Sequence, residues 1–88
     1  MPEQLVLEDL ATGLVNRMTE RGLRLATAES TVGGLIGYAV TSVPGASKVF
    51  AGGITAYSNA PKRELLHVPM ETMEQYGSVS GATVEAMA

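Results

Sequence analysis

Two kinds of hydrophobic spacing alternate along these 88 residues, and this alternation limits the possible folds more than any other feature. Residues 3–21 carry apolar side chains at helical spacing, with acidic residues near the start and arginines near the end, as the helix dipole favours. Gly22 is a suitable stop for this helix. Residues 23–27 then alternate between apolar and polar side chains, which predicts a short strand.

The same alternation continues in the second half of the chain. A second helix is predicted to begin within residues 32–34 and to end before the turn pair Pro44-Gly45. Residues 48–58 are rich in β-branched and aromatic side chains and predict a second strand, in which Gly52-Gly53 indicates a bulge or a close backbone approach. Three short helices are predicted to follow, at residues 58–66, at residues 69–75, and from an N-cap at Ser80 to Ala88.

This order of elements predicts an α/β fold with layered helices and sheet. Two strands are too few for a stable sheet, because about three or more are usually needed. The pattern also stops inside the last predicted helix. We therefore expect residues 1–88 to form a partial, truncated domain, completed by further chain or by a partner. Apolar edges left exposed in this way predict a homo-oligomer.

Composition excludes several classes of protein. Hydrophobic residues make up 45% of the chain and charged residues 17%, which excludes a disordered polymer. The net charge is −3 and the basic residues are scattered, which argues against binding to nucleic acid. The chain lacks cysteine, and no apolar run approaches the ~20 residues of a membrane span. We therefore predict a cytoplasmic protein. The acidic residues show no metal-ligand spacing, and His67, the only histidine, is expected to be a packing or surface residue. We therefore predict no metal site.

The turn between the first strand and the second helix is the first candidate for chemistry. Such a turn directs backbone N–H groups at one spot, and Gly33 and Gly34 allow a ligand to approach closely, with the hydroxyls of Ser30 and Thr31 nearby. The functional interpretation is a phosphate cradle, an oxyanion hole or both, with Ser30 as the nucleophile. The alternative is a hydroxyl-capped helix followed by packing glycines.

The second candidate is the segment 57–62, at the end of the second strand, where α/β sheets bind ligands. A lysine that loses its charge through burial acts as a base, so Lys62 and Tyr57 could support a nucleophile. Glu29 could orient Lys62, cap the turn or form an ordinary ion pair. The alternative is a tyrosine at the edge of the core and a solvated lysine on a helix.

Taken together, the segments resemble a known family, the CinA C-terminal domain. Residues 26–34 (TAESTVGG after the first alanine) resemble its TAES-C-T-GG motif, and residues 43–47 resemble its DVPGAS turn. Residues 52–62 resemble GG-x-x-x-YSN-x-x-K, residues 65–69 resemble LLGVP, and residues 76–80 resemble HGAVS. The motifs occur in the family's order over nearly the whole chain.

The resemblance implies hydrolysis of the carboxamide of nicotinamide mononucleotide to nicotinic acid mononucleotide and ammonia, without a cofactor. It implies that Ser30 attacks the carboxamide and that Lys62 takes its proton, with a relay through Tyr57. Ser–Lys pairs are an established alternative to the Ser-His-Asp arrangement. The implied substrate- or phosphate-binding residues are Thr31, Gly33, Gly34, Ser58 and Asn59, with Glu29 and Ser80 in support.

Two departures from the family pattern favour other interpretations. Thr31-Val32 stands where the family has Cys-Thr, so one hydroxyl is lost. Family domains also continue well past the point that matches Ala88, with a TGIAGP segment and further strands. The alternatives are a non-catalytic relative that binds a nucleotide or a partner subunit, and a structural fragment. The joint presence of Ser30, Tyr57 and Lys62 favours the enzyme.

Overall fold

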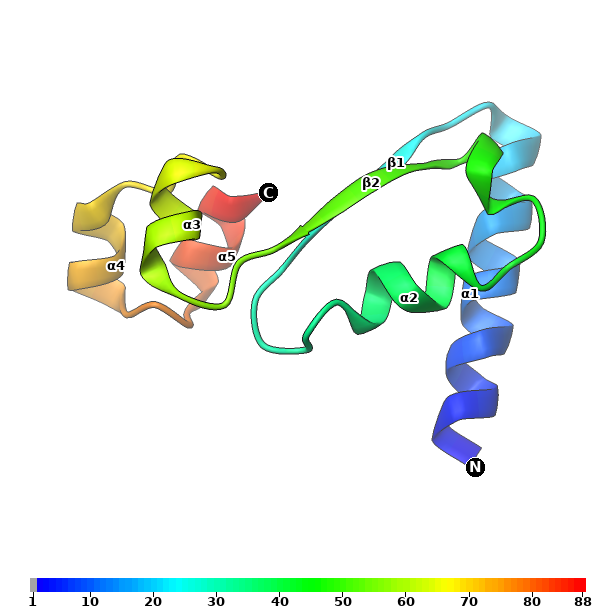
Figure 1. Ribbon diagram of the computed structural model, residues 1–88, viewed down its shortest axis with the longest axis horizontal. Coiled ribbons are helices and arrows are strands. Elements are labelled where there is room, and N and C mark those ends of the chain that lie inside the picture. Colours follow the sequence, from blue (N-terminus) through cyan, green and yellow to red (C-terminus); the bar gives the residue numbers. More distant parts are fainter. Residues whose placement is uncertain (1) are drawn as a thin grey trace. The chain divides into compact units, whose positions relative to one another are not determined.

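The computed structural model describes residues 2–88, with side chains from Val6 onward, and contains helices and two strands (Figure 1). The predicted alternation of helix and strand is confirmed. The elements in chain order are α1 (Pro2–Arg21), β1 (Leu25–Glu29), α2 (Leu35–Thr41), the 3-10 helix η1 (Ala46–Lys48), β2 (Phe50–Thr55), α3 (Asn59–Glu64), α4 (Met70–Tyr76) and α5 (Gly81–Met87).

The two strands are neighbours in one parallel sheet, which confirms the α/β class (Figure 1). Leu25 N donates to Val49 O at 2.9 Å near the start of both strands. Ala56 N donates to Glu29 O at 2.8 Å near the end of both. Because pairing advances in the same direction on the two strands, their carboxyl ends lie at the same edge.

The chain forms two compact units, each with its own apolar core. The first comprises residues up to Thr27 together with Gly34–Gly53. The second comprises Ala28–Gly33 and Ile54–Ala88. The core of the first unit is formed by α1, α2 and the segment that follows α2, through Ala11, Val15, Ala39, Val40, Val43, Ala46 and Val49. In the second unit the short helices gather around Ala56, Val68, Met73 and Met87.

The first strand begins two residues later than predicted because the chain is still closing α1. Gly22 adopts a left-handed conformation (φ 64°), Gly22 N donates to Thr19 O at 3.2 Å, and Leu23 N donates to Met18 O at 2.9 Å. This pair of bonds is the Schellman motif that ends many helices. Leu23 is therefore engaged with the helix and cannot join the sheet.

The second strand is shorter at both ends than the predicted 48–58. The strand starts later because η1 precedes it, and in this tight turn Val49 N donates to Ala46 O at 2.9 Å. The β-propensity of the side chains does not predict such a turn. Its end at Thr55 is followed by the start of α3 at Asn59. In the described part of the chain, no helix has the length and apolar character needed to cross a bilayer.

The close backbone approach predicted at Gly52-Gly53 is found at Gly53. A Cβ built on Gly53 would collide with the Thr27 hydroxyl and would lie 3.5 Å from the Thr27 carbonyl oxygen on β1. Gly53→Ala is therefore expected to lower the free energy of unfolding by about 1–3 kcal/mol, the usual effect of overpacking. Chemical denaturation measures this loss.

Gly13→Ala is the matched control for this substitution. Gly13 lies within α1, and a Cβ there meets no atom within 4 Å. Alanine should stabilise this helical position by up to about 1 kcal/mol. Removing the obstructing hydroxyl with Thr27→Ala should restore part of the stability of Gly53→Ala. Equal effects of the two glycine substitutions would contradict the close approach.

Candidate functional site

The candidate site lies in the second unit, at the carboxyl edge of the sheet. The bond from Ala56 N to Glu29 O joins the residue that follows β2 to the last residue of β1. Ser30 is the next residue after Glu29, and Tyr57 is the next residue after Ala56. Neighbouring strands are about 4.8 Å apart, so these two segments leave the sheet side by side. This edge is where parallel α/β sheets place ligands.

The Ser30 hydroxyl is enclosed and has no hydrogen-bond partner among the described residues. An enclosed polar atom without a partner costs about 1–3 kcal/mol in lost hydration, so such atoms are rare in folded proteins. The cost is tolerated where the atom has another use, such as contact with a bound molecule. This observation singles out Ser30 among the hydroxyl residues of the chain.

The turn after Ser30 contains two glycines with left-handed backbone conformations. Gly33 and Gly34 both adopt left-handed conformations, with φ of 64° and 89°. A helix cannot include such residues, so α2 begins at Leu35, just after the predicted range of 32–34. Thr31 and Val32 are exposed in this turn. Gly33 is exposed as well, and the binding role that the resemblance implies for Thr31, Gly33 and Gly34 stays a prediction.

Lys62 is buried in α3, with 1% of its surface exposed. Lysine is almost never buried to this extent unless its amine is paired. Its Nζ donates to the carbonyl oxygen of Ser78 at 2.9 Å. The interpretation of Lys62 as a solvated helix lysine is therefore wrong. Ser30 Oγ has no partner among the described residues, so no hydrogen bond joins it to Lys62.

A small network fixes the loop that receives the Lys62 amine. Buried Thr83 donates through Oγ1 to Gly77 O at 2.7 Å, and its backbone N–H donates to Ser80 Oγ at 3.2 Å. Ser80 is thereby the N-cap of α5, as predicted. Ser78 lies between these two anchors. Ser80 and Thr83 thus position the carbonyl that holds Lys62.

Thr83 and Ser78 are the parts of the site that sequence reasoning missed. The available signal was the spacing Ser80-x-x-Thr83, which is typical of a helix start with two hydroxyls. That spacing predicts a cap but does not say that the capped loop reaches Lys62, sixteen residues away.

Tyr57 and Ser58 are less constrained than Lys62. Ala56 is buried, whereas the next residue, Tyr57, is 79% exposed, as expected for neighbours that point to opposite faces of an extended chain. The Tyr57 hydroxyl makes no hydrogen bond within the described residues, and Ser58 precedes α3 without a side-chain cap bond. The relay through Tyr57 stays a prediction. Glu29 is buried at the end of β1 and makes interactions of its own.

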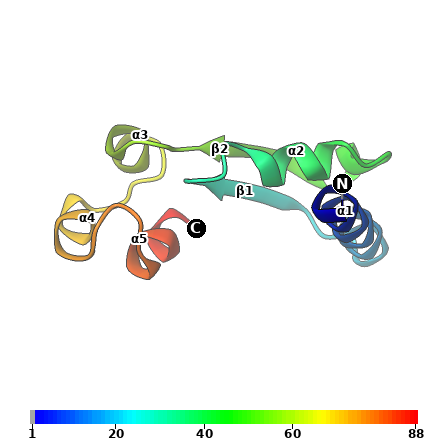
Figure 2. The same ribbon diagram turned by 90° about the horizontal axis from the view of Figure 1, so that it is seen from below.

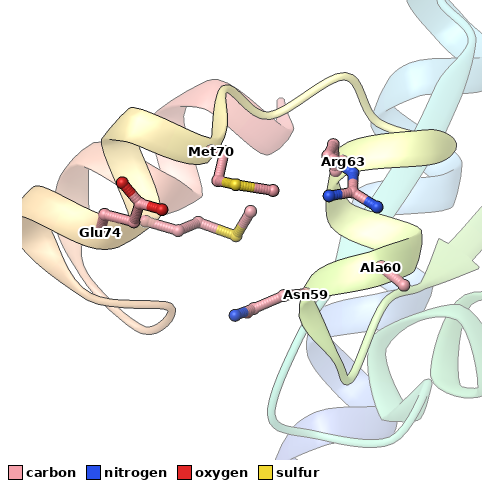
Figure 3. A pocket seen from close by; sticks show the side chains of 6 residues that line it. Asn59, Ala60, Arg63, Met70 and Glu74 are labelled. Carbon is pink, nitrogen blue, oxygen red and sulfur yellow. The ribbon is translucent and has the colours of Figure 1, made fainter.

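An open groove of about 340 Å³ lies between α3 and α4 in the second unit (Figure 3). Asn59 and Arg63 from α3 face Met70 and Glu74 from α4 across it. Its volume is in the range of small-molecule sites. Asn59 is the one predicted substrate-binding residue that lines it. Within the described part of the chain, no three His, Asp or Glu residues gather to hold a metal.

The network beneath Lys62 gives a testable prediction. Thr83→Val keeps the shape of the side chain but removes its bond to Gly77 O, which should lower the free energy of unfolding by about 1–2 kcal/mol. Thr12→Val is the control, because the Thr12 hydroxyl bonds to Glu8 O on the exposed side of α1. We expect the control to change stability by less than about 0.5 kcal/mol. Equal losses in thermal unfolding would contradict a special role for Thr83.

Comparison with known proteins identifies the family. The family model of the CinA C-terminal domain matches residues 7–88. A CinA-like protein from Parasynechococcus marenigrum (strain WH8102) is 49% identical over 81 residues, which are 92% of this chain and 19% of that protein. A CinA-like protein from Synechococcus sp. (strain CC9902) is 48% identical over the same length.

Solved structures agree with the sequence comparison. The competence/damage inducible protein CihA from Agrobacterium tumefaciens superposes with a TM-score of 0.91 at 41% identity, over 93% of this chain and 50% of that one. A competence or damage-inducible protein from Enterobacter asburiae gives a TM-score of 0.89 at 34% identity, over 93% and 52%. The chain thus spans about half the length of these structures and about a fifth of the curated relatives. It belongs to the CinA C-terminal domain family.

Proposed function

We propose that this chain carries the nucleophile and the general base of an amide hydrolase that converts nicotinamide mononucleotide to nicotinic acid mononucleotide and ammonia in the cytoplasm. The observation that carries the proposal is the enclosed, unpartnered hydroxyl of Ser30 at the carboxyl edge of the sheet. The buried amine of Lys62 in the same compact unit supports it. Family membership and the motifs around these residues point the same way.

The proposed reaction has two halves. Ser30 Oγ attacks the carboxamide carbon while the Lys62 amine accepts its proton, directly or through Tyr57. Backbone N–H groups of Thr31 and Gly33 stabilise the oxyanion, an interaction that contributes about 2.7–4 kcal/mol per donor in known hydrolases. The C–N bond then breaks, and the leaving nitrogen takes the proton from Lys62 and departs as ammonia. Water hydrolyses the acyl-serine and regenerates Ser30.

The bond from Lys62 to Ser78 suits this role. A neutral amine has two N–H donors and one lone pair. Donation to the Ser78 carbonyl fixes one N–H and limits the directions in which the lone pair can point. Asn59, which lines the groove between α3 and α4, would bind the ribose phosphate end of the substrate together with Ser58.

The test measures ammonia release from nicotinamide mononucleotide by two proteins. The first is the 88-residue chain, and the second, here called the completed chain, joins residues 1–88 to the second half of the Agrobacterium tumefaciens relative. We expect release by the completed chain that depends on Ser30. Because the chain spans half of that relative, slower release or none is expected from the 88 residues alone. Ser30-independent release by the completed chain would contradict the proposal.

A second candidate is a non-catalytic module that binds the nucleotide or a sister subunit. The short span of the match favours it, as does exposed Val32 at a position where the family has a hydroxyl. Calorimetric titration with nicotinamide mononucleotide separates the two. Binding by the completed chain without ammonia release would support the module, and release would support the enzyme.

A further inference from the structure

The amine of Lys62 is bonded to an oxygen that belongs to a loop. Its Nζ donates to Ser78 O at 2.9 Å, and Ser78 lies in residues 77–80, which join α4 to α5 and which we call the α4–α5 loop. Figure 2 shows the two helices side by side with this loop between them. A lysine stem is flexible, so α3 fixes the backbone of Lys62 but not its amine. The position of the amine therefore depends on what holds the α4–α5 loop.

The loop is held at Gly77, directly before Ser78. Gly77 N donates to Met73 O at 2.9 Å at the end of α4, and Gly77 O accepts from Thr83 Oγ1 of α5 at 2.7 Å. Gly77 has a φ of 94°, a conformation that glycine adopts readily and other residues rarely do. Both polar backbone atoms of Gly77 are thus bonded. The peptide that joins Gly77 to Ser78 is fixed immediately before the carbonyl that accepts from Lys62.

Two hydroxyls reach Gly77 O, and Thr83 makes the shorter bond. Ser80 Oγ lies 3.2 Å from Gly77 O and 3.2 Å from Thr83 Oγ1, but a serine hydroxyl has one hydrogen and donates to one acceptor at a time. Thr83 Oγ1 lies 2.7 Å from Gly77 O, and Thr83 is 0% exposed, so water does not compete for this bond. Thr83 is therefore the principal anchor of the loop.

The Thr83 hydroxyl is not needed to start α5. The N-cap bond of this helix runs from the backbone N–H of Thr83 to Ser80 Oγ, and a backbone N–H is present whatever the side chain at position 83. The hydroxyls of Thr12, Thr19 and Thr41 each bond to a carbonyl four residues earlier in their own helices. That of Thr83 instead bonds to a carbonyl outside α5. The hydroxyl therefore stabilises the loop rather than the helix that carries it.

We propose that Thr83 is a positioning residue for the general base: acting through Gly77 and Ser78, it fixes the Lys62 amine for proton transfer from Ser30. This inference rests on the proposed amidase and adds to it a residue outside both candidate segments of the sequence. Thr83 acts through the loop and is buried, so we expect it to affect the rate of the chemical step and not the binding of substrate.

The first test measures how firmly the amine is held, without an assay of activity. The lysines of the chain are Lys48 and Lys62, so NMR of the 88-residue chain with isotope-labelled lysine resolves one amine signal from each. We expect the buried Lys62 amine to exchange its hydrogens with water more slowly than that of exposed Lys48. Thr83→Val should speed the exchange at Lys62 by about tenfold or more, the ratio that corresponds to one lost hydrogen bond.

Two further variants separate a hold on the amine from a general loss of stability. Thr83→Ser keeps the hydroxyl and should leave exchange at Lys62 within about threefold of the wild-type rate. Gly53→Ala destabilises the first unit by overpacking and should also leave it within about threefold, because exchange by local opening does not follow global stability. If Gly53→Ala speeds the exchange as much as Thr83→Val does, Thr83 has only a general structural role and the proposal is overturned.

The second test follows ammonia release from nicotinamide mononucleotide by the completed chain. Thr83→Val should lower kcat per folded molecule by about 10–100-fold, the order of effect that a small displacement of a reacting group produces. It should leave KM within about twofold, because no contact with substrate is removed. Thr83→Ser should restore most of kcat. Thr19→Val is the matched control, since the Thr19 hydroxyl also donates to a carbonyl at 2.7 Å, that of Val15 in α1, and it should change neither constant by more than about twofold.

Three other results would overturn the proposal. The first is an amine of Lys62 that exchanges as fast as that of Lys48 in the wild-type chain. The second is Thr83→Ser behaving as Thr83→Val does, and the third is Thr83→Val keeping its kcat per folded molecule. A completed chain that releases no ammonia would instead contradict the proposed amidase, and the exchange rates alone would then decide whether Thr83 holds the amine. Faster exchange and a lower kcat in Thr83→Val, both reversed by serine, would support the proposal.

Discussion

Ser30→Ala in the completed chain is expected to lower kcat for nicotinamide mononucleotide hydrolysis by about 10⁴-fold or more, the usual loss when a nucleophilic serine is removed. The same substitution should leave the protein as stable as before, or more stable by up to about 1 kcal/mol. This follows because the Ser30 hydroxyl is enclosed and lacks a partner among the described residues, so its removal breaks no hydrogen bond to any of them. Steady-state ammonia release and denaturant titration measure the two quantities.

Ser47→Ala is the matched control, because Ser47 lies exposed in η1, within the first unit. It should change neither quantity measurably. Two outcomes would contradict a catalytic Ser30. In one, Ser30→Ala keeps more than about a tenth of the wild-type rate. In the other, activity and stability fall together, as they would if Ser30 were a structural hydroxyl.

Lys62→Met in the completed chain is expected to lower kcat by about 10²–10⁴-fold, the range for loss of a general base. Methionine keeps the apolar stem that α3 buries but cannot accept a proton from Ser30. It also removes the donor to Ser78 O, so the free energy of unfolding should fall by about 1–2 kcal/mol. The fall in kcat should be the larger effect when both are expressed as free energies.

Lys48→Met provides the control, since it makes the same chemical change at an exposed lysine of η1. It should leave kcat within about twofold and stability within about 0.5 kcal/mol. If Lys62→Met lost stability but kept its rate per folded molecule, Lys62 would be a structural residue. An added primary amine that restores turnover to Lys62→Met but not to Ser30→Ala would support the assignment of the base.

The fold was predictable from the sequence to the extent that it depends on local spacing. The helical period of residues 3–21 and the β-rich segment after Lys48 specify α1 and β2 without reference to the rest of the chain. The errors lie where a backbone hydrogen bond decides the outcome. The backbone N–H of Leu23 is bonded within the Schellman motif of α1, and the backbone N–H of Val49 is bonded within the turn of η1. Neither hydrogen bond can be predicted from the spacing of hydrophobic residues.

The candidate site was predictable in its residue types but not in its contacts. Ser30 follows a strand and precedes glycines, so its place at the sheet edge could be inferred from sequence. The burial of Lys62 could not, because it depends on Ser78, sixteen positions along the chain. Thr83 fixes that loop through Gly77 and was missed for the same reason. Long-range contacts of this kind require the folded structure.

Because the two lysines have different surroundings, their acylation rates can be compared to measure local opening of the fold. Lys48 is exposed, whereas the amine of Lys62 is enclosed and bonded to Ser78 O. An acylating reagent at neutral pH should therefore label Lys48 at once and Lys62 only when the second unit opens. Peptide mapping of acetyl groups over time would report the opening rate of that unit in native buffer.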